Sequence, residues 1–282
     1  MTVRVGFVTC VQLGLSCMEE IYKCGGKLDA VMTLPDDRAR AKSGRVYLDD
    51  FCAATGVPLA KFANINDLAA VSWIQQMKLD WLLIIGWSQI ARSELLAAVE
   101  RGAIGMHPTL LPEGRGRSAI PWTILKGLSV TGVSMFQLDE GVDSGPLLGQ
   151  RRVSVAERET ATTLYRKVER AHRGLIRDTW PALVSDQITL VPQDDSLATV
   201  WPGRTPADGR LYPSMSVLEA DRLIRAVTRP YPGAFFDVGR KRLRIWNATP
   251  AAFASARETG VILQFADGEL IALDVEEEEV TE

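Results

Sequence analysis

The strongest constraint on the fold is a regular alternation of short apolar runs with helical segments between residues 3 and 106. Short apolar runs rich in β-branched side chains are typical of buried strands, and helices between them allow the strands to run parallel. We therefore predict a doubly wound, Rossmann-like and mostly parallel α/β sheet. The expected strands are 3–8, 28–34, 57–61, 81–85 and 103–106, and the expected helices are 13–24, 46–55, 67–77 and 92–101.

The pattern changes after residue 150. We expect a strand at 151–155, a long helix at 161–183 and a strand at 188–192. Residues 193–215 are rich in Asp, Pro, Gly and Arg and are interpreted as an ordered linker. A helix at 217–227 and four short strands predict a small C-terminal β-barrel of the oligonucleotide-binding-like type. The predicted division is an N-terminal domain 1–192, a linker 193–215 and a C-terminal domain 216–282; the four short strands are 234–238, 243–247, 259–265 and 270–275.

Composition limits the classes of function. The 282 residues carry a formal net charge of −3, with a sequence pI of about 5.6, and residues 274–279 are acidic. Proteins that grip a nucleic-acid backbone usually present a basic surface, so a tRNA partner is disfavoured. No apolar run reaches membrane-spanning length and the N-terminus does not resemble a signal peptide, so we expect a cytoplasmic protein without a membrane partner. Four cysteines without a Cys-x-x-Cys pair indicate reduced, buried thiols; they are Cys10, Cys17, Cys24 and Cys52.

Two polar loops follow apolar runs and carry the candidate chemistry. His107 lies in a proline-bounded turn, HPTLLP, directly after the expected strand 103–106. Asp143 lies in an acidic loop, DEGVDSGP, directly after the alternating run 133–138. Loops that follow parallel strands meet at one edge of a sheet, so we expect the two side chains to converge. A histidine that faces a carboxylate is a positioned base, with a partner that orients it.

The ordered set HPTLLP, GRGR, TGV and LDEGVDSGP resembles the folate-dependent formyltransferases, which include methionyl-tRNA and sugar-nucleotide N-formyltransferases. The separation of His107 and Asp143, 143 − 107 = 36 residues, fits that family. The resemblance implies catalytic roles for both residues. It also implies N10-formyltetrahydrofolate as co-substrate and no metal.

One position departs from this family. The family usually has Asn-x-His, with a side-chain amide beside the reacting carbonyl, whereas this chain has Gly105-Met106-His107. Losing one such donor typically costs ~100- to 1000-fold in rate. A backbone amide, a water, Ser88 or Gln89 would have to compensate, and Gln89 is the first side chain to examine because it carries an NH₂ group.

The resemblance also implies binding residues. The folate would lie between the loops 87–90 and 139–142, that is, against Trp87, Ser88, Gln89, Ile90, Asp139, Glu140, Gly141 and Val142. The candidate substrate-binding residues are Thr109, Arg115, Arg117, Trp201 and Arg204. Trp87 could instead be a core aromatic, and Trp201 could instead pin the linker. The segment 36–45 is either a solvated loop or a basic lip over an anionic substrate, formed by Arg38, Arg40, Lys42 and Arg45. His172 lies in a charged helical segment and is given no role.

The function that follows is formyl transfer to a primary amine, with a nucleotide-linked amino sugar as the expected acceptor. The alternatives are a methionyl-tRNA formyltransferase, a formyltetrahydrofolate hydrolase, and a folate- or nucleotide-binding relative that has lost catalysis with the asparagine. Retention of both His107 and Asp143 disfavours a pure binding protein. A homodimer is an open alternative to a monomer.

Overall fold

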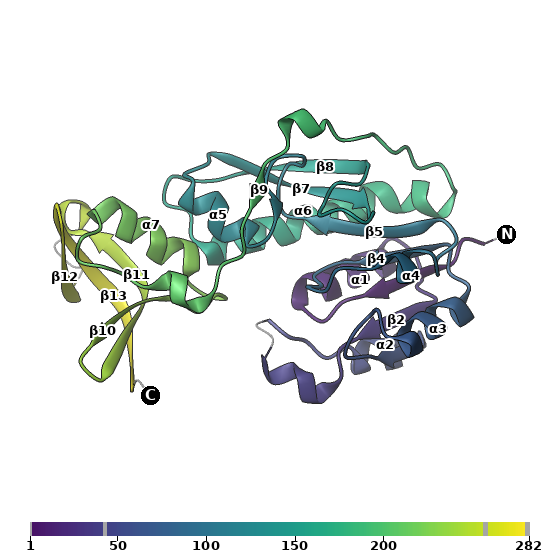
Figure 1. The fold of residues 1–282 in the computed structure, drawn as a ribbon, viewed down its shortest axis with the longest axis horizontal. Coiled ribbons are helices and arrows are strands. Elements are labelled where there is room, and N and C mark those ends of the chain that lie inside the picture. The colour runs from purple at the N-terminus through teal and green to yellow at the C-terminus, as the bar shows by residue number, and fades with distance from the viewer. Residues whose placement is uncertain (1, 42–43, 256–258, 280–282) are drawn as a thin grey trace. The chain divides into compact units, whose positions relative to one another are not determined.

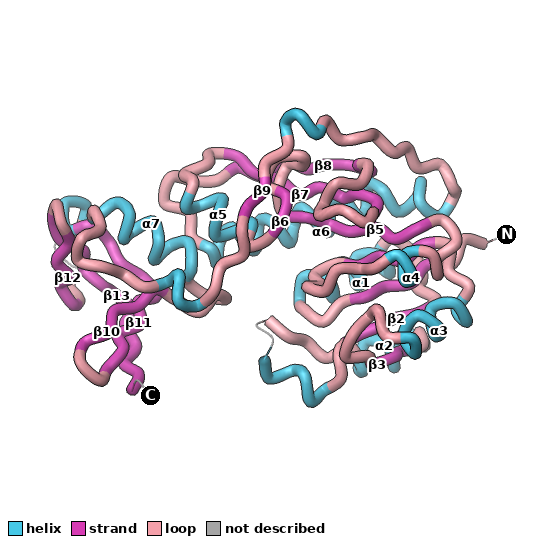
Figure 2. The backbone as a smooth tube through the Cα atoms, in the orientation of Figure 1, coloured by secondary structure: helices cyan, strands magenta, loops and turns pink. Residues whose placement is uncertain are grey.

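The computed structural model describes residues 2–41, 44–255 and 259–279, with the side chains of 39–41 excluded. Its main sheet has seven strands in the order β3-β2-β1-β4-β5-β7-β8 (Figures 1 and 2). The strands from β3 to β5 pair in parallel, whereas β7 runs antiparallel to β5. The predicted mostly parallel α/β sheet is confirmed. The strands are β1 Val5–Val8, β2 Ala30–Thr33, β3 Leu59–Lys61, β4 Trp81–Ile84, β5 Gly102–His107, β7 Val130–Gln137 and β8 Leu147–Ser154.

The predicted helices are found near their expected positions, two of them shorter than predicted, and a further helix, α5, was not predicted. Residues 46–55 and 92–101 were predicted to be helical, but α2 begins at Asp49 and α4 is a single turn. The helix α6 contains His172, which is fully buried and therefore does not lie on a charged face. The helices are α1 Gln12–Lys23, α2 Asp49–Thr55, α3 Leu68–Met77, α4 Ser93–Leu96, α5 Ala119–Leu125, α6 Ala161–Val184 and α7 Val217–Val227.

Local sequence explains the sharp turn that follows β1. A side chain on Gly14 would place its Cβ 1.9 Å from the Thr9 hydroxyl oxygen, so the first turn of α1 can approach β1 only with glycine there. The Thr9 hydroxyl accepts a hydrogen bond from the Val11 backbone amide at 3.4 Å. The close approach of α1 to the end of β1 therefore depends on glycine at position 14.

The segment after α6 differs from the prediction. The prediction of a strand at 188–192 is wrong, because only an isolated bridge between Val191 and Leu147 forms there. Residues 193–215 are ordered, and contain β9 Val200–Trp201 paired with β6 Arg115–Gly116, together with two 3-10 turns, Asp195–Leu197 and Pro206–Gly209.

The C-terminal part forms a four-stranded antiparallel sheet in the order β10-β11-β13-β12, as expected for a small β domain. Its strands are β10 Ala234–Val238, β11 Lys241–Pro250, β12 Val261–Phe265 and β13 Gly268–Glu279, with a 3-10 turn Ala251–Phe253. Helix α7 precedes them and begins with a capping box, in which Ser216 and Glu219 exchange hydrogen bonds with each other's backbone amides.

Contacts divide the chain into two compact units that interleave in sequence. The first comprises Met1–Gly116, Thr131–Val153 and Lys167–Val200, and the second comprises Arg117–Val130, Ser154–Arg166 and Trp201–Glu282. The predicted boundaries at 192 and 215 stay a prediction. Among the described residues, no helix combines the length and apolar character that a membrane span requires.

Candidate active site

His107 is the last residue of β5, in the first unit. Its imidazole is buried, with 8% of the residue exposed. Nε2 lies 2.8 Å from the carbonyl oxygen of Gly114, and Nδ1 lies 3.4 Å from Oδ2 of Asp143. A carbonyl oxygen can only accept, so in the neutral ring Nε2 carries the proton and the Nδ1 lone pair faces the carboxylate. Nδ1 is therefore the atom that can take up a proton, and Asp143 would stabilise the resulting charge.

The structure brings Asp143 to His107 by a different route from the predicted one. Because β7 is antiparallel to β5, the two loops do not follow parallel strands, so the reason given for their convergence is wrong. Asp143 adopts a left-handed backbone, with φ 54°, which Asp tolerates better than most residues. Its Oδ2 accepts a hydrogen bond from the Gly116 backbone amide at 2.8 Å. This bond ties the acidic loop to the turn after the histidine.

Gln193 completes that connection and was not identified from the sequence. Its Nε2 donates to the carbonyl oxygens of Asp143, at 2.9 Å, and Gly145, at 2.7 Å. Its Oε1 accepts from Nη2 of Arg115 at 2.8 Å. Arg115 also forms an ion pair with Asp195 at 2.6 Å. Arg115 thus braces the loop that carries Asp143, and its guanidinium is engaged by protein groups.

The residues around Asp139 shape the second half of the acidic loop. Oδ1 of Asp139 accepts hydrogen bonds from the Gly141 amide, at 3.0 Å, and the Ser144 hydroxyl, at 2.9 Å. A Cβ on Gly141 would lie 1.9 Å from the Ser144 oxygen, so glycine is required there. Glu140 and Val142 are exposed. The Asp139 carboxylate therefore links the backbone and side chains of this loop, whose outer edge is exposed.

The loop after β4 contains the other predicted folate contacts. Trp87 packs partly against the core, and its Nε1 is buried without a hydrogen-bond partner among the described residues. Ser88 is exposed, and Ile90 is 66% exposed. The Gln89 carboxamide bonds to the backbone of the loop between β3 and α3. Its Nε2 donates to the Ala63 carbonyl oxygen at 2.7 Å, and its Oε1 accepts from the Ile65 amide at 2.9 Å. One N–H of its NH₂ group is therefore engaged by Ala63, and the bond to Ile65 holds the carboxamide against this loop.

The space beside Gly105 is filled by a neighbouring side chain. Gly105 is buried and lies opposite Phe136 in the pairing of β5 with β7. A Cβ at this position would lie 2.7 Å from Cδ2 of Leu138 and 3.4 Å from Cζ of Phe136. The apolar side chains of Leu138 and Phe136 thus line the space that a side chain at position 105 would enter.

The remaining predicted substrate residues divide between the units. Thr109, in the first unit, is buried, and its hydroxyl has no hydrogen-bond partner among the described residues. Trp201, in the second unit, is buried with Lys126 5.7 Å from its ring centroid. The guanidinium of Arg204 lies 5.2 Å from the centroid of the Trp122 ring, and its Nη2 donates to the backbone carbonyl oxygen of Asp208 at 2.8 Å. Arg117 is exposed, beside Gly203.

The basic lip is only partly described. Arg45 donates to the Thr33 hydroxyl at 2.8 Å and to the Leu34 carbonyl oxygen at 2.6 Å, which gives it a structural use at the end of β2. Arg38 is exposed. The side chains of Arg40 and Lys42 lie outside the described residues. Within the part of the chain that the structure describes, no three His, Cys, Asp or Glu side chains gather in a way that suits a metal ion.

Similar solved structures share this fold over nearly the whole chain. A methionyl-tRNA formyltransferase from Clostridium thermocellum has a TM-score of 0.68 at 20% identity, covering 99% of this chain and 100% of that one. An N-formyltransferase from Helicobacter canadensis, in complex with folinic acid and dTDP-3-aminofucose, has a TM-score of 0.69 at 15% identity, covering 96% of this chain and 99% of that one. HypX from Aquifex aeolicus in complex with tetrahydrofolic acid has a TM-score of 0.71 at 16% identity, covering 98% of this chain and 44% of that one.

The sequence itself matches two family models. Residues 38–179 match the formyl transferase model, and residues 204–278 match the formyl transferase C-terminal domain. The first match alone covers half of the chain and includes the histidine, the glycine beside it and the acidic loop. The chain therefore belongs to the formyl transferase family.

Proposed function

We propose that this chain is an N-formyltransferase that moves the formyl group of N10-formyltetrahydrofolate to a primary amine of a nucleotide-linked amino sugar. The observation that carries the proposal is the placement of His107 Nδ1 opposite Asp143, 3.4 Å away, in a chain of this family. Acyl transfer to an amine requires removal of one proton from nitrogen, and this pair provides a place for it.

The two loops fit a folate by their surface chemistry. Ile90 and Val142 expose 66% and 52% of their surface, and they offer apolar cover to the faces of a flat ring. The exposed backbone of 139–142 offers hydrogen-bonding groups for a donor–acceptor edge. The bound co-substrate would supply the formyl carbon, and His107 would take the amine proton at Nδ1 while Asp143 stabilises the imidazolium.

Charge favours a small anionic acceptor over tRNA. The net charge of −3 lacks the excess of basic residues that phosphate-backbone binding usually requires. One similar structure was solved with a nucleotide-linked amino sugar, dTDP-3-aminofucose. The second candidate function is formyl transfer to methionyl-tRNA. It is supported by the similar structure of a methionyl-tRNA formyltransferase, which this chain matches over its full length.

The apolar surface at Gly105 sets an expectation for the rate. A transition state with a negative oxygen needs a donor beside it, and removal of one such donor typically costs ~100- to 1000-fold. With Leu138 in that position and the Gln89 amide bound to Ala63, we expect slow turnover by the wild-type protein.

The test is a measurement of tetrahydrofolate release by the purified protein with N10-formyltetrahydrofolate. The acceptor panel contains amino-sugar nucleotides, methionyl-tRNA and no acceptor. We expect release that depends on one amino-sugar nucleotide, together with a formylated product. His107→Gln is the matched inactive control, because its carboxamide can still donate to the Gly114 oxygen but cannot act as a base near neutral pH.

Other outcomes assign other activities. Release only with charged tRNA would replace the proposal with the second candidate, and release without acceptor would indicate a hydrolase. Folate binding without release under any condition would mean that the chain is a non-catalytic relative.

A further inference from the structure

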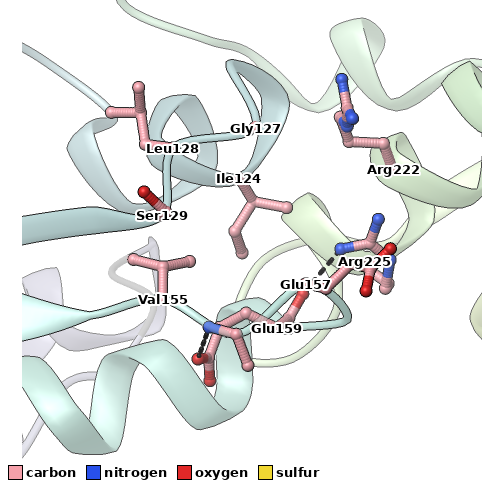
Figure 3. A pocket seen from close by; sticks show the side chains of 10 residues that line it. Ile124, Gly127, Leu128, Ser129, Val155, Glu157, Glu159, Arg222 and Arg225 are labelled. Carbon is pink, nitrogen blue, oxygen red and sulfur yellow. Dashed lines mark hydrogen bonds between the residues drawn. The ribbon is translucent and has the colours of Figure 1, made fainter.

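A cavity of about 270 Å³ lies within the second unit, and none of its lining residues belongs to the site around His107. Figure 3 shows three segments around it: the end of α5 with the turn after it, the loop before α6, and helix α7. The apolar lining comes from Ile124, Leu128 and Val155. The volume is just below the ~300 Å³ at which ordinary ligand pockets begin, so an occupant would be small.

The charges that line this cavity balance. Two arginines, Arg222 and Arg225, come from one face of α7, and two glutamates, Glu157 and Glu159, come from the opposite loop. A balanced lining suits a ligand without net charge better than it suits a simple anion, which would leave excess negative charge.

Two of these four groups are already used by the protein. Arg225 donates to Asp221 at 2.8 Å and to the Glu159 carbonyl oxygen at 2.9 Å. The Glu159 carboxylate accepts from the Ala156 amide at 2.9 Å. This network fixes the wall of the cavity and makes Arg225 a structural residue.

The other two groups have no protein partner. The side chains of Arg222 and Glu157 form no hydrogen bond or ion pair with any residue that the structure describes, and they do not pair with each other. The Arg222 guanidinium lies against the turn at Gly127, within 3.3 Å of where a Cβ would be, and Gly127 has φ 64°. Glycine at this turn thus gives the guanidinium room to lie beside the cavity.

We propose that this cavity binds a small zwitterion of the α-amino-acid class with an aliphatic side chain. Arg222 would bind the carboxylate with two parallel hydrogen bonds, and Glu157 would bind the ammonium group. Ile124, Leu128 and Val155 would cover the aliphatic part. The site is separate from the formyl-transfer proposal, and its test does not depend on that activity.

The test is isothermal titration calorimetry of the full chain with L-leucine, N-acetyl-L-leucine, L-leucinamide and inorganic phosphate. We expect L-leucine to bind, and each single-charge analogue to bind at least ~10-fold more weakly, because one charge-assisted contact is lost. Arg222→Gln and Glu157→Gln should each weaken L-leucine binding by a similar factor. Both side chains lack protein partners, so the variants should melt like the wild type.

Arg240→Gln is the matched control, because Arg240 is exposed in the turn between β10 and β11 and is not part of the lining. Its L-leucine affinity should equal that of the wild type. Phosphate or N-acetyl-L-leucine binding as tightly as L-leucine would overturn the proposal in favour of an anion site. A dissociation constant for L-leucine above about 1 mM, or unchanged affinity in both Gln variants, would overturn it altogether.

Discussion

Replacing Gly105 by asparagine should make the protein a faster enzyme and a less stable one. The new Cβ would lie 2.7 Å from Cδ2 of Leu138, the end of a flexible and only partly buried side chain, and 3.4 Å from Phe136. Leu138 can turn aside, and inserting atoms into packed surroundings typically costs ~1–3 kcal/mol. In proteins of ~150–250 residues, a loss of 1 kcal/mol in the free energy of unfolding lowers Tm by about 2–4 °C. On that basis the substitution should lower Tm by roughly 2–12 °C.

The gain lies in the transition state. A side-chain amide donor beside the reacting carbonyl is worth about 2.7–4 kcal/mol, or ~100- to 1000-fold in kcat. Because the donor acts on charge that develops only during the reaction, kcat should rise while KM for the formyl donor changes little. The assay is steady-state tetrahydrofolate release with the acceptor identified above, beside a thermal melt of each protein.

The double variant Gly105→Asn, Leu138→Ala separates the two effects. It should recover part of the stability lost by the single variant, with a coupling energy of about 0.5–3 kcal/mol, because the asparagine then fills the space that the leucine leaves. If both variants fold and neither exceeds the wild-type kcat, position 105 does not serve the oxyanion, and the reasoning is refuted.

Three further predictions concern other residues. Asp143→Asn should lower kcat by ~100-fold or more, because the neutral amide no longer stabilises a charged His107. The protein should stay folded, because the amide oxygen can still accept a hydrogen bond from Gly116. Near-normal turnover would contradict the role assigned to Asp143. Glu20 is 3% exposed; burial raises its pKa, but the hydrogen bonds from Arg177 and Arg173 outweigh this and hold the pKa below its ordinary value. Glu20→Gln should therefore cost about 1–3 kcal/mol in urea unfolding at pH 7, a range kept low because both arginines are partly exposed. This stabilisation is present above the ordinary pKa of 4.5 and is lost as the pH falls through the lower folded pKa. A deficit that does not shrink as the pH is lowered would contradict it. Burial lowers the pKa of His172 from 6.5 to about 4. The free energy of unfolding is therefore unaffected by this group above pH 6.5 and should fall by roughly 2 kcal/mol by pH 5, because the unfolded chain takes up the proton first. His172→Leu should flatten that part of the stability curve, and an unchanged curve would show that other groups cause it.

Local pattern predicted most of the fold. The alternation of apolar and helical segments placed β1 to β5 and α1 to α3, because strand and helix periodicity are properties of neighbouring residues. The same reasoning failed at 188–192, where an apolar run has no strand to pair with beyond one bridge to Leu147. It also failed at His172, which lies among charged residues in sequence but is buried on α6.

The site was predictable only as a pair of motifs. Sequence spacing and resemblance singled out His107 and Asp143, and the structure places them 3.4 Å apart. Gln193 gave no signal, because it stands at the start of a polar linker and its hydrogen-bonded partners lie 48 to 78 residues away. Arg115 was predicted to bind substrate for a similar reason, since its partner Asp195 lies 80 residues away in sequence.

The sequence by itself determined most of the order of strands and helices, the family and the presence of glycine at 105, since each of these is a property of residue types at given positions. The tertiary structure decided what each polar group binds. The Gln89 amide faces Ala63, Leu138 fills the space beside Gly105, and β7 turns antiparallel to β5. These outcomes depend on packing between segments far apart in the chain, where steric fit and competition among hydrogen-bond partners select one arrangement from many that local propensity allows.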